Sequence, residues 1–332
     1  MHQFTRRRFN ASMLLSWGAT MLAIPEVVSA QAAYPQKSIT MLLGFPPGGS
    51  TDFIARLVGQ KLTDALGQPV VVENRPGANG LLAAGIATAT PPDGYTLLLT
   101  SMGLTTNPYL YTRNKLDPNK NFTAISMVAN VANVLVTSPA VPAKDLRELL
   151  ALARSRSNPM TQATTGQAAP GHLAGELLQR AAKVKFENVA YKGSGPALTD
   201  LMAGHVDMSM PTVVAALPFI KSGKLRAHAV TGAKRSSLLP EVPTFGEAGF
   251  PELGAGSGWY GLVGPAGIPK DIAEKLNSEV TKLMRVPEVR ERFIANGADP
   301  ITSSTAEMSS FLAQDYKRWG ELIKATNIKA ED

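Results

Sequence analysis

Residues 38–62 read SITMLLGFPPGGSTDFIARLVGQKL, an apolar run followed by a turn and then by a helical pattern. The run at 39–45 has the length of a buried strand, and the PPGG at 46–49 cannot continue it because proline has no N–H to donate to a neighbouring strand. The STD at 50–52 supplies good N-cap residues for a helix, and the apolar side chains after it recur at helical spacing. This stretch therefore predicts a buried strand that enters a helix through a glycine-rich turn.

That turn is a candidate anion site. At a helix start several backbone N–H groups have no partner within the helix, and the positive end of the helix dipole lies behind them. Such an arrangement binds anions without a lysine or an arginine. Many strand-to-helix turns have the same form and bind nothing, so the turn alone leaves both interpretations open.

Residues 1–30 have the pattern of an export signal. A twin-arginine motif, TRRRF at 5–9, precedes a mildly apolar segment at 11–24 and a small-residue cleavage site that ends at Ala30. The apolar segment is too short and too polar to span a membrane. We expect a periplasmic protein that is exported by the twin-arginine route and cleaved near Ala30. General secretion is the alternative route, because Asn10 weakens the motif, and an amphipathic anchor that stays attached is the alternative to cleavage.

Composition excludes several kinds of chemistry. The 332-residue chain has no cysteine, which removes thiol catalysis and cysteine metal sites and leaves burial to hold the fold together. Part of its net charge of +7 lies in the export signal, and the other lysines and arginines are scattered, with no basic stripe and no interleaved aromatics. Nucleic acid is therefore not an expected partner. Without the signal, about 300 residues remain, enough for two domains with cores of their own.

Strands and helices alternate along the rest of the chain, which is typical of parallel sheets with helical crossovers. One such series ends near residue 101, and a second begins after the extended apolar segment 125–138. A later apolar strand at 259–264 returns the chain to the first series, and Trp259 and Tyr260 are expected to pack at a hinge. Two extended crossings between two α/β series imply two lobes with a ligand cleft between them. The predicted division is the signal at 1–30, lobe 1 at 31–130 and 256–332, and lobe 2 at 131–255.

At each predicted strand end, small or polar residues lead into a helix. The GSG at 193–195 is a second glycine-rich helix start, in the other lobe, that suits an anion. Several such turns at one cleft rim would form a pocket for a small polar ligand. Asp207 has two interpretations: a carboxylate that caps a helix or pairs with a lysine, or a single acid that contacts a ligand amine or a water. The candidate ligand-binding residues are Phe45, Pro47, Gly48, Gly49, Thr51, Asn79, Ser101, Thr165, Gly166, Ala168, Tyr191, Gly193, Ser194 and Asp207.

Catalytic signatures are missing from the sequence. It contains no G-x-S-x-G elbow, no P-loop and no H-E-x-x-H motif. Ser101, His172 and Asp207 all lie near predicted strand ends and would form a triad on paper, but no oxyanion signature accompanies them. His172, His205 and His228 lack the spacing of a compact metal site and are expected to be structural. We therefore expect no catalytic residue, no metal and no cofactor.

Short motifs occur in order along the chain. They are FPPGG at 45–49, ENRPGANG at 73–80, DGYTLL at 93–98, HLAGE at 172–176, YKG at 191–193 with PAL at 196–198, GHVD at 204–207, LPEVPT at 239–244 and GLVGPAG at 261–267. In this combination the chain resembles the tripartite tricarboxylate transporter substrate-binding proteins, also called Bug receptors. The resemblance covers essentially the whole chain after the signal. The combination of motifs is specific, although no single motif is.

The resemblance implies a type II, two-lobed α/β periplasmic binding protein that closes on a small carboxylate: a di- or tricarboxylate, an acidic amino acid or an aromatic acid. It implies that backbone groups and ordered waters at 45–49 and 191–196 hold the ligand's carboxylates. It also implies a partner, either a membrane permease without an ATPase or a sensor, and we expect the receptor to be a monomer.

One departure from the family pattern affects the ligand. The segment QAAPG at 167–171 lacks the hydroxyl residues that the family often has there. This makes the wall less polar and favours a ligand with an apolar or aromatic part. The predicted function is extracytoplasmic capture of a small carboxylate for a transporter or a sensor. A cleft enzyme, such as a hydrolase that acts on a small carboxylate, is the alternative.

Overall fold

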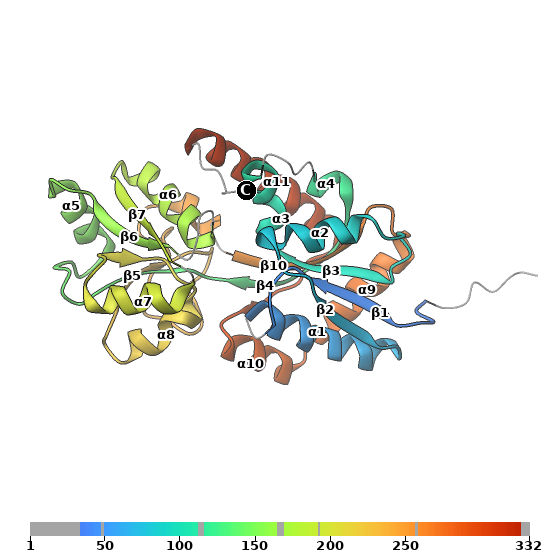
Figure 1. Cartoon of the computed structure of the whole chain (residues 1–332). Helices are drawn as coiled ribbons and strands as arrows, with labels where there is room; N and C mark the ends of the chain where they lie inside the picture. The colour runs from blue at the N-terminus through green and yellow to red at the C-terminus, as the bar shows by residue number, and fades with distance from the viewer. Residues whose placement is uncertain are drawn as a thin grey trace, which may run out of the picture. The chain divides into compact units, whose positions relative to one another are not determined.

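The computed structural model of the chain describes residues 34–47, 50–111, 116–164, 169–191, 193–255 and 258–326. Every described residue belongs to one compact unit, which comprises residues 34–332. Within that unit, strands and helices alternate to build two β-sheets with helices on both faces of each (Figure 1). Among the described helices, none is both long and apolar enough to cross a membrane.

The larger sheet has six strands, and the three at one edge run parallel to one another. The apolar run predicted as a strand is β1, and its successive side chains go to opposite faces: Met41 and Leu43 enter one core and Leu42 the other. Burial on both faces explains why this strand is a continuous apolar run. β1 pairs in parallel with β2 and β3, and β10 runs antiparallel between β3 and β4. In sheet order the strands are β11 (Asp299–Pro300), β4 (Phe122–Val131), β10 (Gly258–Pro265), β3 (Thr96–Ser101), β1 (Ile39–Leu43) and β2 (Val70–Asn74).

Helices cover both faces of this sheet. One core packs under α1, α9 and α10 and contains Ile54 and Phe293, while the other packs under α2, α3 and α11 and contains Leu104 and Trp319. The helices are α1 (Ser50–Leu66), α2 (Leu81–Thr88), α3 (Gly103–Leu110), α4 (Pro118–Asn121), α9 (Lys270–Leu283), α10 (Pro287–Ala295) and α11 (Thr305–Thr326), with the 3-10 turn η1 (Ala78–Gly80) before α2.

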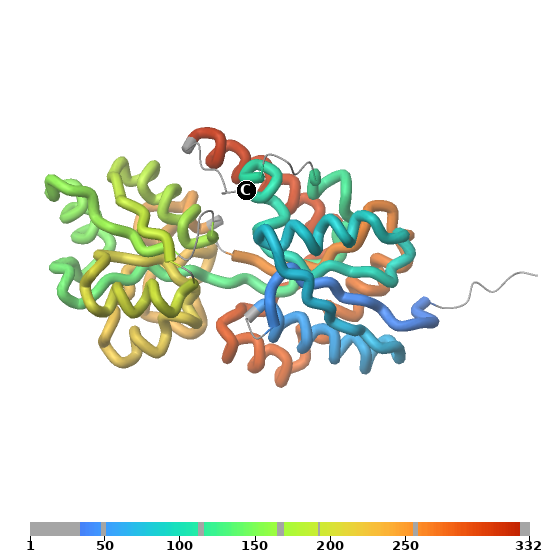
Figure 2. The backbone as a smooth tube through the Cα atoms, viewed as in Figure 1, coloured from blue at the N-terminus to red at the C-terminus, as the bar shows by residue number. Residues whose placement is uncertain are grey.

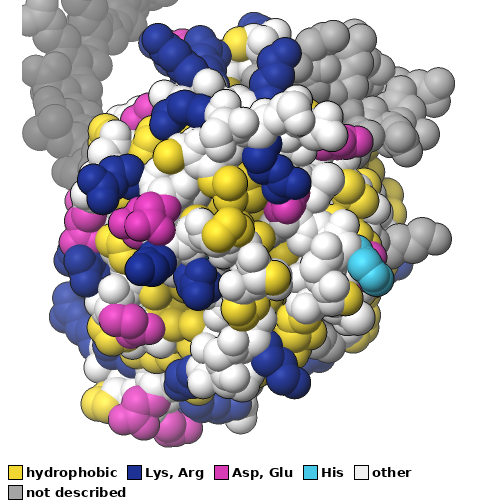
Figure 3. Space-filling model, turned by 90° about the vertical axis from the view of Figure 1, so that its left-hand side faces the viewer, with side chains coloured by type: hydrophobic (Ala, Val, Ile, Leu, Met, Phe, Trp, Pro, Cys, Tyr) yellow, Lys and Arg dark blue, Asp and Glu magenta, His cyan; other side chains and the backbone are white. Residues whose placement is uncertain are grey.

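The smaller sheet has five strands in a mixed arrangement. β6 pairs in parallel with β7 and β8, while β5 runs antiparallel to β8 and β9. α5 and α6 cover one core and α7 and α8 the other. Figure 3 views the molecule from the left of Figure 1, and on this face lysines and arginines are interspersed with acidic and apolar side chains. The elements are β5 (Val134–Thr137), α5 (Leu146–Ser155), β6 (Met160–Thr164), α6 (Pro170–Ala182), β7 (Phe186–Ala190), α7 (Ser194–Ala203), β8 (Met208–Ser209), α8 (Val213–Lys221) and β9 (Arg226–Val230).

Two connections join the sheets (Figure 2). β4 belongs to the larger sheet and β5, the next strand, to the smaller one, so the extended segment predicted at 125–138 contains strands of both. The second connection runs from β9 to β10 and includes the 3-10 turn η2 (Pro251–Ala255). The connections are hydrogen-bonded to each other, because the Asn133 N–H donates to Thr231 Oγ1 over 2.9 Å and the Thr231 N–H donates to the Asn133 carbonyl over 2.8 Å.

The sequence did not predict helix α3. Its residues, GLTTNPYL, include a glycine, two β-branched threonines and a proline, which are poor helix formers. Tertiary hydrogen bonds hold it in place: Thr105 Oγ1 donates to Asp315 Oδ2 over 2.6 Å, and Asn107 Nδ2 donates to the Asn79 carbonyl over 3.0 Å. The short helix α4 was not predicted from the sequence either.

The turn after β1 approaches η1 so closely that position 44 requires glycine. A Cβ on Gly44 would lie 2.3 Å from the Gly80 Cα, a backbone atom that cannot rotate away. We predict that Gly44→Ala lowers the free energy of unfolding, measured by urea titration, by about 1–3 kcal/mol, as overpacking does. Gly85→Ala in α2 is the matched control, since a Cβ there meets nothing within 4 Å and the helix should gain about 1 kcal/mol. Parent-like stability of Gly44→Ala would contradict the close approach.

Candidate functional site

A cavity of about 190 Å³ lies where the two sheets are joined. The register explains why its walls meet there: Tyr260 of β10 pairs with Ser101 at the end of β3, and Asn133 forms a bridge with Thr212, the residue before α8. This cavity lies beyond the carboxyl ends of β1 and β3, the usual position for ligands in open α/β sheets. The described lining residues are Phe45, Thr51, Asn79, Ser101, Met102, Gly103, Val131, Asn133, Pro170, Thr212, Gly258, Trp259 and Tyr260.

No charged side chain occurs among these described lining residues. Helix starts border the cavity instead. Thr51 lies in the first turn of α1, and Gly103 begins α3. Pro170 begins α6, and Thr212 is the N-cap residue of α8. Each helix N-terminus carries free N–H groups and a partial positive charge of roughly half an elementary charge. Such termini favour an anion in the cavity without a lysine or an arginine.

The turn between β1 and α1 is braced from outside the cavity by Asn74. Its Nδ2 donates to the Phe45 carbonyl over 3.0 Å and to Asp52 Oδ1 over 2.9 Å. Asp52 Oδ2 in turn accepts from Arg56 Nε over 2.9 Å. Asp52 is only 6% exposed and does not line the cavity. It therefore stabilises the first turn of α1 without adding a charge to the described wall of the cavity.

Tyr260 brings a hydroxyl to the cavity. Thr51 Oγ1 donates to the Tyr260 hydroxyl over 3.1 Å, which joins the first turn of α1 to β10. Burial raises the pKa of Tyr260, and the hydrogen bond from Thr51 opposes this rise without cancelling it. The phenol is consequently neutral at physiological pH. It accepts from Thr51 and keeps its own proton to donate.

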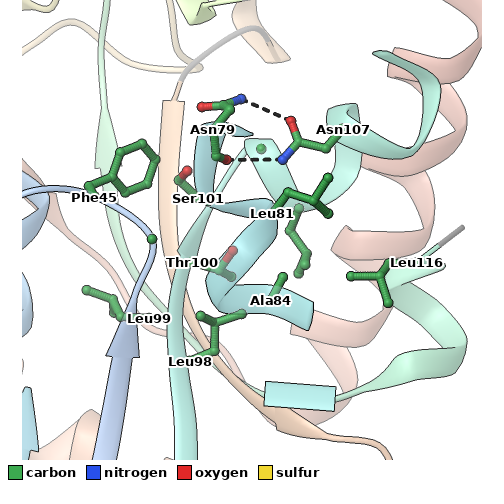
Figure 4. Close-up of a pocket in the computed structure, with 14 residues that line it drawn as sticks. Phe45, Asn79, Leu81, Ala84, Leu98, Leu99, Thr100, Ser101, Asn107 and Leu116 are labelled. Atoms are coloured by element: carbon green, nitrogen blue, oxygen red, sulfur yellow. Dashed lines mark hydrogen bonds between the residues drawn. The ribbon is translucent and has the colours of Figure 1, made fainter. Parts of the chain in front are cut away.

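The orientation of the Asn79 amide is fixed by Asn107 (Figure 4). Asn107 Nδ2 donates to the Asn79 carbonyl over 3.0 Å, so its Oδ1 is the atom left to accept from Asn79 Nδ2, at 3.1 Å. The Asn79 side-chain oxygen is thereby turned away from Asn107, as Figure 4 shows. These bonds also hold Asn79 at a φ of 52°, a left-handed conformation that asparagine tolerates. Behind Asn79 and Ser101, a smaller cavity of about 10 Å³ has room for about one water molecule.

Asn133 adds an acceptor beside the connection from β4 to β5. Its Nδ2 donates to the Met210 carbonyl over 2.9 Å, which fixes the orientation of the amide. Its Oδ1 is buried and has no hydrogen-bond partner among the described residues. A buried oxygen in this state costs about 1–3 kcal/mol. Asn133 is also one of the described lining residues of the cavity.

Four of the predicted site residues line the cavity: Phe45, Thr51, Asn79 and Ser101. The others fall into two groups. Pro47 is exposed in the turn before α1, and Tyr191, Gly193 and Ser194 lie around the start of α7 and are not among the described lining residues. Tyr191 donates its hydroxyl to Asp200 Oδ2 over 2.8 Å. Gly48, Gly49, Thr165, Gly166 and Ala168 lie outside the described residues.

Asp207 immediately precedes β8 and has partners of its own. Its Oδ1 accepts from Arg156 Nη1 over 2.7 Å, and its Oδ2 accepts from the Thr161 N–H over 2.8 Å. Burial disfavours its ionisation, but the hydrogen bonds from Arg156 and Thr161 outweigh burial and hold the pKa of Asp207 below its ordinary value. These contacts correspond to a structural ion pair with an arginine. Asp207 is not among the described lining residues.

The histidines considered for catalysis or metal binding have separate surroundings. His172 Nε2 lies 3.2 Å from Asn188 Nδ2 and 3.6 Å from Glu176 Oε1. His228 Nε2 lies 2.8 Å from Thr137 Oγ1, and the Nδ1 of His205 lies 3.4 Å from Asp200 Oδ1. No cluster of three or more metal-ligating side chains occurs in the described part of the chain.

Sequence reasoning missed most of the wall that comes from the returning segments. Val131, Asn133 and Gly258 were missed, and Trp259 and Tyr260 were expected at the hinge without contact to a ligand. Met102, Gly103, Pro170 and Thr212 lie in strand-end turns that the sequence analysis expected at the cleft rim, but it did not include them among the ligand contacts. An antiparallel strand that returns to a parallel sheet begins beside the carboxyl ends of its neighbours. That rule would have placed the start of β10 in the wall.

The two sheets, their connections and the cavity at the junction define a periplasmic binding protein fold. A solved structure described as a periplasmic transporter is 36% identical, with a TM-score of 0.76 over 90% of this chain and 100% of that one. Rpa4515 of R. palustris, solved with adipate, is 31% identical with the same TM-score of 0.76 and the same coverage, 90% and 100%. BugT of Bordetella pertussis is 35% identical over 328 residues, which cover 96% of this chain and 99% of BugT.

The family model of TctC, the tripartite tricarboxylate transporter family receptor, matches residues 54–328. The chain therefore belongs to the tripartite tricarboxylate transporter receptor family. The members of this family are periplasmic solute-binding receptors and not enzymes. The resemblance stated from the sequence motifs and the expectation of a non-enzymatic receptor are confirmed, and the alternative of a cleft hydrolase is wrong.

Asn107 should be essential for the shape of the wall at η1. We predict that Asn107→Asp lowers the free energy of unfolding at pH 7 by about 1–3 kcal/mol, because a carboxylate would face the Asn79 carbonyl and could not donate to it. The pKa of the new carboxyl would be raised in the fold, so the deficit should shrink as the pH falls through that raised pKa and be smallest below about 4, the ordinary pKa of an aspartate in the unfolded chain. Asn119→Asp, at an exposed position in α4, is the control. A deficit that is the same at pH 7 and pH 3.5 would contradict this account of Asn107.

Proposed function

We propose that this receptor captures a small carboxylate in the cavity at the junction of its sheets and presents it to a tripartite-type permease or to a sensor. The observation that carries the proposal is a cavity whose described lining residues carry no charge and that is bordered by the N-terminal turns of α1, α3, α6 and α8. An anion is the ligand that such termini favour. The adipate in the related Rpa4515 structure supports a carboxylate as the ligand class.

Because the described lining residues carry no positive charge, hydrogen-bond donors must stabilise the negative charge of the ligand. A carboxylate that leaves water for an uncharged cavity loses its hydration, and hydrogen bonds must replace it. Backbone N–H groups at the helix starts and the Tyr260 phenol are suitable donors, and bonds to an ionised acceptor are roughly twice as strong as neutral ones. We propose that the turn at 45–49 and the loop at 191–196 hold the ligand from two sides. The candidate contacts of the sequence analysis, Asp207 included, stay predictions.

The rest of the wall suits an apolar part of the ligand. Met102, Val131 and Trp259 border the cavity with apolar surface, and Pro170 borders it at the start of α6. Pro170 belongs to the QAAPG segment that lacks the family's hydroxyl residues. We therefore propose a carboxylate with an apolar or aromatic body.

Capture would involve movement of two lobes. We propose that residues 31–130 with 256–332 form one lobe and residues 131–255 the other, with the hydrogen-bonded pair Asn133 and Thr231 in the hinge. Ligand that contacts both lobes stabilises the closed arrangement and shifts the equilibrium toward it. The permease or the sensor would recognise the closed form.

We also propose a cellular location and an oligomeric state for the receptor. We propose that residues 1–30 are an export signal of the twin-arginine type, cleaved near Ala30, and that the mature receptor acts as a monomer in the periplasm. The TRRRF motif at 5–9 and the family's periplasmic members support this location.

A carboxylate panel tests the proposed function. The purified receptor is heated with adipate, succinate, malate, glutamate or benzoate, and each compound is recovered afterwards. A ligand present at a hundred times its Kd should stabilise the fold by about 2.7 kcal/mol. We expect at least one carboxylate to raise the Tm and to be recovered unchanged. Failure of every carboxylate to raise the Tm, or turnover of the one that does, would refute the proposal.

The Tyr260 phenol provides a sharper test of the site. We predict that Tyr260→Phe weakens binding of the stabilising carboxylate at least about tenfold, because a hydrogen bond to a charged group contributes about 1.5–3 kcal/mol. Titration calorimetry measures the affinity. Tyr34→Phe is the control, since the Tyr34 hydroxyl donates to the Gly94 carbonyl over 2.6 Å and does not line the cavity. Parent-like affinity of Tyr260→Phe would show that the Tyr260 hydroxyl does not bind the ligand.

A further inference from the structure

Asp315 is a buried carboxylate that joins α11 to α3 and to β10. It is 2% exposed. Its Oδ2 accepts from Thr105 Oγ1 on α3 over 2.6 Å and from Trp259 Nε1 on β10 over 3.1 Å. Its Oδ1 accepts from Trp319 Nε1 over 3.1 Å and pairs with the guanidinium of Arg318. One side chain that does not line the cavity thus meets four partners from three elements.

Every one of these partners is a donor toward Asp315. An indole N–H and a guanidinium have no acceptor to offer, and the Thr105 hydroxyl donates here. Burial raises the pKa of Asp315, while the charge of Arg318 and the hydrogen bonds from Thr105, Trp259 and Trp319 oppose that rise. An ionised carboxylate has acceptors on both oxygens, whereas an asparagine has them on one side only. The cluster is therefore matched to a carboxylate and not to an amide of the same size.

Trp259 connects this cluster to the cavity. It borders the cavity at the start of β10, yet it is only 2% exposed. Its ring packs edge-on against Phe311 of α11, with 5.4 Å between the ring centroids. α11 therefore contacts the indole twice, through the ring of Phe311 and through the hydrogen bond from Nε1 to Asp315. Two fixed contacts leave a bulky wall residue in one orientation.

We propose that Asp315 is a positioning residue of the ligand cavity, which holds the Trp259 indole in the wall without touching the ligand. This inference rests on the proposed function, since the position of Trp259 affects affinity only where a ligand occupies the cavity. A wall residue that is displaced by a fraction of an ångström fits the ligand less well. Loss of the carboxylate should consequently weaken binding from a distance.

A purely structural role for Asp315 would have a different signature. Replacement would then lower stability, but it would not act on Trp259 more than on the rest of the core. The two roles differ in whether the effect passes through the indole Nε1.

Fluorescence of the unliganded protein distinguishes the positioning role of Asp315 from a purely structural one. The sequence contains three tryptophans, so Trp17→Phe and Trp319→Phe in the full chain leave Trp259 as the single emitter. In this background, Asp315→Asn should keep its carbonyl toward Arg318, because the charged donor is the stronger one. Its amide N–H group then faces Trp259, whose own N–H cannot accept. We expect the emission maximum to move to longer wavelength and acrylamide quenching to increase.

Thr105→Val is the matched control for this measurement. It removes the other donor from the same Oδ2 and leaves the bond from Trp259 in place. We expect the emission of Trp259 to match that of the background protein. An unchanged spectrum for Asp315→Asn, or an equal shift for Thr105→Val, would overturn the proposal.

A double-mutant cycle on affinity completes the test. The affinity for adipate is measured by titration calorimetry. If adipate does not bind, the carboxylate of the panel that raises the Tm most takes its place. We expect Asp315→Asn to weaken binding about tenfold in the parent, and to cause no further loss in Trp259→Phe, which keeps an aromatic ring but has no Nε1. Additive losses in the two backgrounds, or parent-like affinity of Asp315→Asn, would overturn the proposal. If no carboxylate binds the parent, the proposed function fails, and the fluorescence of the unliganded protein still decides whether Asp315 holds Trp259.

Discussion

An anion in the cavity would be held by the N-terminal turns of α1, α3, α6 and α8, because the described lining residues carry no charge. The arrangement follows from topology. The carboxyl ends of parallel strands β1 and β3 lead into α1 and α3, and the end of β8 leads into α8. The antiparallel return of β10 closes the same edge with Trp259 and Tyr260. In the proposed site, partial charges on peptide groups would replace a cation and would favour a carboxylate without the cost of burying an arginine or a lysine.

Charged and amide side chains lie one layer behind this wall. Asn74 and Asp52 brace the turn before α1, and Asn107 fixes the left-handed conformation of Asn79. Asp315 contacts the indole of Trp259 from α11. In each case a hydrogen-bonded polar side chain supports a wall segment whose described lining residues carry no charge. Polar networks of this kind make the geometry rigid when every member has its partners.

The sequence alone predicts those strands and helices whose buried side chains recur at a regular spacing. The apolar run of β1, the glycine-rich turn and the periodic helix α1 were predictable because strand and helix cores have distinct periods. Helix α3 was not, since its stability comes from tertiary bonds of Thr105 and Asn107 that no local pattern records. The residues of the site divide in the same way, into those that local patterns predict and those that they do not. Phe45, Thr51, Asn79 and Ser101 follow strand ends along the chain, whereas Trp259 enters the wall through strand register, which depends on residues far away in the sequence.

The central claim is that the negative charge of the ligand, and not merely its shape, is recognised by neutral donors. The most direct measurement compares the best-binding carboxylate of the panel with its own primary amide by titration calorimetry at several salt concentrations. The account predicts that the carboxylate binds at least about tenfold more tightly than the amide, with a modest dependence on salt because the site is partly buried. Equal affinities of the acid and the amide would contradict it.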